Sequence, residues 1–167
     1  MSFQLRLLCG FALVSMAAPA FAEWTRSRVP EFGFSADFPS KPEVESSVDE
    51  GVKLTGYSAA KDGTLCLVVV GDYGGTVDPE VELPASRDSF AKGVKSQITS
   101  QKRILFPRGA KNLQALQFDT ASETYLFRSL IVIEGPQVYQ IAGGVPKDGG
   151  NRADLERCIR GFALIVK

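Results

Sequence analysis

A predicted β-hairpin constrains the fold of this chain more than any other feature. It covers residues 123–145, ETYLFRSLIVIEGPQVYQIAGGV, and turns at Glu134-Gly135-Pro136. Its first arm is rich in aromatic and β-branched residues, which favour strands, and the Gly-Pro pair would interrupt a helix. Apolar side chains occur on both faces of this arm. The sheet that contains it therefore needs a covering layer on each side.

The other elements follow from hydrophobic periodicity and turn residues. An apolar period near 3.6 residues predicts a helix from Pro84 to about Gln97, and Asn151 can cap a second helix that ends at Gly161. Alternating or continuous apolar runs predict further strands at 32–38, 44–48, 52–59, 65–70, 101–106, 111–120 and 162–166. This order predicts an α+β fold, an antiparallel β-sheet flanked by helices.

The first 22 residues have the pattern of a secretory signal peptide. Arg6 precedes an apolar run over 7–16, and Ala20-Phe21-Ala22 is an A-x-A cleavage site before Glu23. The apolar run is short for a membrane span, and no second run of roughly 18 apolar residues follows. We therefore expect a periplasmic or secreted protein, cleaved after Ala22, with no transmembrane segment and with 23–167 forming a single domain.

Two cysteines remain once Cys9 is removed with the signal peptide. Cys66 and Cys158 would reside in a compartment where thiols oxidise, which favours a disulfide between them. The alternative is two separately buried thiols, because free cysteine is often a core residue.

Several classes of chemistry lack the residues that they need. The chain has no histidine, which removes histidine-based triads and histidine-ligated metals. The glycine pairs lack the spacing of a phosphate-binding loop. Acidic residues gather at Asp72, Asp78, Glu80 and Glu82 without the spacing of a calcium loop, and a solvated loop is the simpler interpretation. We predict no enzyme activity and no cofactor.

Charge is balanced overall but divided along the chain. The sequence has 19 basic and 19 acidic residues, which gives no reason to expect nucleic-acid binding. Residues 31–88 hold 12 acidic and four basic residues, whereas 89–118 hold six basic residues and no acidic one. These six are a candidate surface for an acidic protein partner or an anionic membrane: Lys92, Lys95, Lys102, Arg103, Arg108 and Lys111. Alternatively, folding interleaves the two segments and cancels their fields.

Two patterns together resemble the PsbP-like family. The first is an aromatic strand that ends in Phe38-Pro39-Ser40-Lys41-Pro42, and the second is the C-terminal block YLFR, VYQIAGG and FALI. The family comprises extrinsic photosystem II proteins and their bacterial relatives, and a Ran-binding protein shares its fold. The resemblance implies an α-β-α sandwich and a non-catalytic role in binding or assembly. The family's metal sites use histidines, so metal binding is not carried over to this chain.

The sequence thus favours an exported, non-catalytic binding or assembly-assisting protein of the cell envelope. A second hypothesis is a periplasmic carrier of a small apolar ligand in a cleft beside the sheet, suggested by the aromatic strand over 32–38. A hydrolase ranks third.

Overall fold

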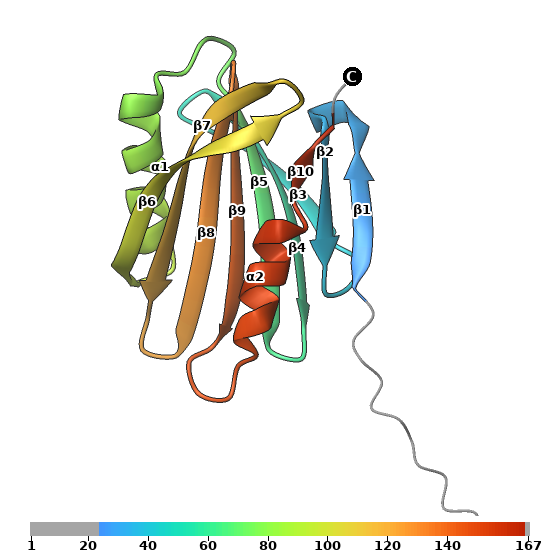
Figure 1. Ribbon diagram of the computed structural model, residues 1–167, viewed down its shortest axis with the longest axis vertical. Coiled ribbons are helices and arrows are strands. Elements are labelled where there is room, and N and C mark those ends of the chain that lie inside the picture. The colour runs from blue at the N-terminus through green and yellow to red at the C-terminus, as the bar shows by residue number, and fades with distance from the viewer. Residues whose placement is uncertain (1–23, 166–167) are drawn as a thin grey trace, which may run out of the picture.

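A computed structural model describes residues 24–165, and the predicted signal peptide with its cleavage site lies outside them. Within this range the strands form two antiparallel sheets (Figure 1). The larger sheet has the order β3-β4-β5-β9-β8-β7-β6, and the smaller has the order β1-β2-β10. The strands are β1 (Thr25–Val29), β2 (Phe34–Phe38), β3 (Glu43–Asp49), β4 (Val52–Lys61), β5 (Thr64–Asp72), β6 (Gln97–Arg108), β7 (Lys111–Ala121), β8 (Tyr125–Glu134), β9 (Gln137–Pro146) and β10 (Ala163–Leu164).

The predicted hairpin is confirmed as β8 and β9, and β9 is the middle strand of the larger sheet. Gly135 occupies the turn with a positive φ of 60°, a conformation that glycine adopts without a steric cost. The more polar hairpin of β3 and β4 is confirmed near one edge, where β3 is exposed along its whole length.

One face of the larger sheet is covered by the smaller sheet together with helix α2 (Arg152–Arg160) (Figure 1). Phe34 and Phe38 of β2 are fully buried against the central strands. The buried Tyr139 hydroxyl donates to the Phe32 carbonyl at 2.8 Å, which ties the short 3₁₀ turn η1 (Pro30–Phe32) to β9.

The opposite face carries helix α1 (Pro79–Gly93), which lies over β7 and β8. Leu83 is fully buried there, and the Phe90 ring makes edge-to-face contacts with Phe118 and Phe127 at 5.8 Å each. This second core is the smaller of the two.

The predicted α+β fold, an α-β-α sandwich, is therefore wrong. Among the described residues the protein is β-rich, with two sheets and two α-helices. One covering layer is made mainly of strands, because the segment before Pro30 and the segment after Gly161 both pair with β2. These pairings join distant parts of the chain, and local periodicity does not report them.

Helix α1 begins earlier and ends earlier than predicted. The Asp78 side chain caps it by accepting from the Glu80 amide at 2.9 Å, and Pro79 occupies the first turn. Pro84 lies inside the helix, and β6 starts at Gln97, where the helix was expected to end.

The predicted disulfide is confirmed. Cys66 of β5 and Cys158 of α2 are bonded, with their Cα atoms 5.9 Å apart. None of the helices in the described part of the chain has the length and apolar character that a membrane span needs.

Candidate functional site

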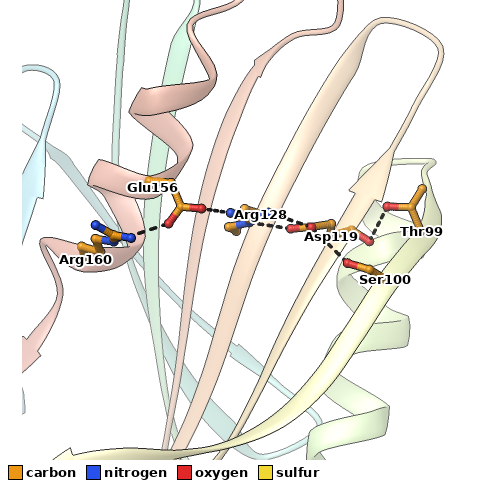
Figure 2. Close-up of polar contacts among 6 residues, drawn as sticks. All are labelled: Thr99, Ser100, Asp119, Arg128, Glu156 and Arg160. Atoms are coloured by element: carbon orange, nitrogen blue, oxygen red, sulfur yellow. Dashed lines mark hydrogen bonds and ion pairs between the residues drawn. The ribbon is translucent and has the colours of Figure 1, made fainter.

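A row of polar side chains crosses the sheet face that carries α2 (Figure 2). Arg128 of β8 donates from Nε to Asp119 Oδ1 of β7 at 2.7 Å and from Nη2 to Oδ2 at 2.9 Å. On its other side Arg128 pairs with Glu156 of α2. Glu156 also contacts Arg160, at 3.6 Å between Oε2 and Nε.

A β-bulge in β6 completes this row. The register of β6 against β7 shifts between Ile98 and Ser100. As a result two adjacent residues of β6 reach the same partner: Ser100 Oγ donates to Asp119 Oδ2 at 3.0 Å, and Thr99 Oγ1 donates to the Asp119 carbonyl at 3.2 Å.

These contacts fix the charges of the row. The hydrogen bonds from Arg128 lower the pKa of the Asp119 carboxyl, and those same bonds raise the pKa of Arg128. Both side chains are about one quarter exposed, with 28% of each accessible. A carboxylate whose pKa is lowered by a bidentate arginine stays ionised and is a weak base, so it is poorly suited to proton transfer and the row instead holds α2 to the sheet.

Two different links therefore hold α2. The disulfide joins its buried side to β5, and the Arg128–Glu156 pair joins its flank to β8. Thr64 adds a third contact near the start of the helix by donating to Asp154 at 2.8 Å. Together these links fix the position of the last turn of α2, from which the chain continues into β10.

A cleft lies between that last turn and the outer strands of the larger sheet. The β6–β7 hairpin curls over this face toward β2 and β10 (Figure 1), and Phe106 of β6 packs on Phe162 with ring centroids 5.8 Å apart. The cleft, which we call the C-terminal cleft, has a volume of about 330 Å³. Most of its lining is apolar, and it consists of Ile104, Phe106, Pro107, Gln117, Leu130, Ile159, Arg160, Phe162, Ala163 and Leu164.

This composition suits a ligand with an apolar body. Ligand sites are mainly apolar concavities with a few polar groups that set orientation, and Gln117 and Arg160 supply such groups here. A second hollow, of about 460 Å³, lies between α2 and the end of β2. Its lining includes Asp37, Glu156 and Arg157, and charged side chains of this kind do not favour an apolar ligand.

The aromatic strand that suggested a carrier does not line the C-terminal cleft. Phe34 and Phe38 of β2 are buried in the main core, and Phe32 belongs to η1. The cleft beside the sheet is built from different aromatic residues, Phe106 and Phe162.

The six basic residues proposed as a partner surface do not gather at one place. Lys102 and Arg103 are neighbours on β6 and therefore point to opposite faces of the sheet. Lys92 and Lys95 lie near the start of β6, whereas Arg108 and Lys111 lie at its far end. A strand of 12 residues separates these ends by about 35–40 Å.

Acidic neighbours also offset part of this positive charge. Arg103 forms two hydrogen bonds with Glu80, at 3.0 and 3.1 Å, and Arg108 donates to Glu134 at 2.8 Å. The arrangement agrees with interleaving of the oppositely charged segments. Binding of an acidic partner or an anionic membrane stays a prediction from the sequence.

Local roles account for the acidic residues of 72–82. Asp72 accepts from the Gly74 amide, and Asp78 caps α1. Glu80 pairs with Arg103, and Glu82 accepts from Tyr73 at 2.6 Å. No group of three or more potential ligands is placed to hold a metal ion in the described range 24–165.

The sequence prediction missed Asp119 and Arg128. Arg128 is a charged residue inside a strand that is otherwise largely apolar, and this was the available signal, whereas Asp119 belongs to a strand of mixed polarity. A charge in such a position needs a partner, since burying an unpaired charge is costly. The cleft itself had no comparable signal, because Ile104 and Phe162 are far apart in the chain.

Comparison with known proteins adds no assignment to this geometry. No protein-family model matches the chain, and no curated protein matches it in sequence.

Proposed function

We propose that this protein is an exported, non-catalytic binding protein that carries a small apolar ligand in the C-terminal cleft. The observation that carries the proposal is the cleft itself, a concavity of about 330 Å³ with a mainly apolar lining. This volume lies at the lower end of the range for small-molecule sites, so the ligand is small.

The sequence favoured an assembly-assisting role over a carrier role. The C-terminal cleft gives more support to the carrier role. An assembly factor needs a surface for its partner, but the six basic residues are distributed over both faces of the sheet and both ends of β6. A carrier needs a preformed concavity, and the disulfide together with the Arg128–Glu156 pair favours a cleft that is fixed before the ligand arrives.

Export is part of this proposal. The signal-peptide pattern predicts that the mature chain begins at Glu23, and a disulfide is typical of a protein that folds in an oxidising compartment. Determination of the N-terminal residue of the exported protein tests this part separately from ligand binding.

Native mass spectrometry of protein purified from its own compartment tests the carrier role. We expect a population with the added mass of a small molecule, which organic extraction removes. Ala163 lines the cleft, so Ala163→Phe should fill it and abolish the added mass. A matched control is Ala153→Phe, at an exposed position in the first turn of α2. Equal retention by both variants, at unchanged melting temperatures, would contradict the proposal.

A further inference from the structure

The C-terminal cleft has a polar end as well as an apolar one. Gln117 and Arg160 are its polar lining residues, contributed by β7 and by the last turn of α2. Lys102 of β6 is the cross-strand neighbour of Gln117. It lies on the same face as the cleft residue Ile104, because side chains two apart in a strand share a face.

The charge available at this end is positive. Asp119 and Glu156 are the neighbouring carboxylates, and both are engaged by Arg128. Arg160 has a single long contact of 3.6 Å with Glu156, and 82% of its side chain is accessible. Together with the hydrogen bonds from Arg128, Lys102 helps to lower the pKa of the Asp119 carboxyl, so that carboxylate offsets part of its charge.

The apolar end is formed by residues from both walls of the cleft. Ile104 and Phe106 from the sheet and Leu164 from the C-terminal segment are partly exposed there, and the buried Leu130 and Phe162 lie behind them. A volume of about 330 Å³ corresponds to roughly 11 water molecules at about 30 Å³ each. A chain of about ten carbon atoms is of comparable size.

We infer that the ligand of the C-terminal cleft is a single-chain amphiphile with a carboxylate head, of the size of a medium-chain fatty acid. Its alkyl chain lies against the partly exposed side chains of Ile104, Phe106 and Leu164. The carboxylate accepts from Lys102 and Arg160 at the polar end, with the Gln117 amide as a neutral donor between them. This inference rests on the proposed carrier function and adds the chemical class of the ligand.

Calorimetric titration of the delipidated protein with three ten-carbon probes tests the inference. The probes are decanoate, 1-decanol and decyltrimethylammonium, each below its aggregation concentration. We expect decanoate to bind about tenfold more tightly than 1-decanol, as charge-assisted hydrogen bonds would give, and the cationic probe to bind most weakly. The preference for decanoate should decrease as ionic strength rises, because both cations are close to solvent.

A pair of variants assigns the preference to the proposed residues. Lys102→Gln combined with Arg160→Gln should reduce decanoate affinity to that of 1-decanol and leave 1-decanol affinity unchanged. The matched control combines Lys111→Gln with Arg152→Gln, which removes two exposed cations from β7 and α2 outside the cleft. Melting temperatures of all variants should stay close to that of the natural chain, because the replaced side chains are exposed.

The outcomes separate the inference from the carrier function. Equal binding of decanoate and 1-decanol would overturn the carboxylate assignment and leave the apolar carrier standing. A decanoate preference that survives in the Lys102/Arg160 variant would overturn the assignment of these residues. Failure of all three probes to bind would overturn both proposals.

Discussion

The two helices lie on opposite faces of the larger sheet and are attached to it in different ways. Helix α2 has nine residues, yet it is held by a disulfide, by an ion pair to β8 and by the buried side chains of Leu155, Cys158 and Ile159. Helix α1 has 15 residues, of which Leu83 and Ala91 are buried. The shorter helix is thus the more firmly attached, and it is the one that borders the C-terminal cleft.

How firmly each helix is attached therefore depends on the chemistry of its contacts rather than on its length. A covalent link restricts the unfolded chain and the helix position at the same time, whereas an apolar contact stabilises only in proportion to the area that it buries. Helix α2, which borders the C-terminal cleft, is held both by the disulfide and by buried apolar side chains.

Removal of the disulfide that holds α2 should have the largest effect on stability. Cys66→Ala combined with Cys158→Ala opens a loop with a sequence separation of 92 residues, and we expect the free energy of unfolding to fall by about 4 kcal/mol. Urea denaturation measures this loss. Reductant should destabilise the natural chain by a similar amount and leave the double variant unchanged. A loss below about 1 kcal/mol would mean that the non-covalent contacts are sufficient to hold α2.

The corresponding change on the other face is Leu83→Ala. Leu83 is a fully buried residue of α1. Removal of its side chain should lower the free energy of unfolding by about 3 kcal/mol, because apolar burial is lost and a cavity is left. Hydrogen exchange should increase in the amides of α1 and stay unchanged in α2. Equal increases in both helices would show that α1 and α2 unfold together, and would contradict a difference in how firmly they are attached.

A close approach of α2 to the sheet predicts a third, smaller effect. A Cβ atom on Gly143 would lie 3.0 Å from Cys158 Cβ and 3.2 Å from Leu155 Cα, so the helix would have to move outward. Gly143→Ala should therefore destabilise the protein by about 1–3 kcal/mol in urea denaturation.

Gly93 at the end of α1 provides the control for this substitution. Apart from its chain neighbours and the backbone of its own helix, no atom of the described residues 24–165 lies within 4 Å of the position that its Cβ would occupy. Gly93→Ala should leave stability unchanged or raise it by up to about 1 kcal/mol, because alanine favours the helix. A similar loss of stability in both variants would argue against a tight contact specific to α2.

The smallest effect concerns the ion-pair row and depends on pH. The pKa of Asp119 is lowered in the folded protein, chiefly by the hydrogen bonds from Arg128, so its contribution to stability is present above its ordinary pKa of 3.8. This contribution is lost as the pH falls through the lowered folded value. Asp119→Asn should cost at most about 1 kcal/mol near neutral pH, because the pair is partly exposed.

Urea denaturation of both chains at about pH 6 and about pH 2 measures this dependence. The difference between the natural chain and Asp119→Asn should narrow at the lower pH. A difference that stays constant with pH would show that Asp119 acts through packing and neutral hydrogen bonds rather than through its charge.

Most of the local elements of this protein could be predicted from its sequence. The hairpins at Gly135 and Gly51 were predictable because a turn depends on a few adjacent residues, and both glycines adopt positive φ. The cap at Asn151 was predictable for the same reason, and its side chain accepts from the Ala153 amide at 3.2 Å. The disulfide could be predicted because two cysteines remained after the predicted signal peptide, whose pattern implies an oxidising compartment.

The second sheet, the partners of the charged residues and the cleft arise from contacts between distant segments and could not be predicted from local sequence. β2 pairs with β10 across more than 120 residues of chain, as in the pair of Ser35 with Ala163, and such pairing leaves no periodicity in either segment. The pairs Arg103–Glu80 and Arg128–Glu156 likewise join separate elements. Basic and acidic residues that are segregated along the sequence therefore lie next to each other in the structure. The C-terminal cleft exists because β6, β7 and β8 face α2 and β10, and the spatial order of elements is a property of packing rather than of local sequence.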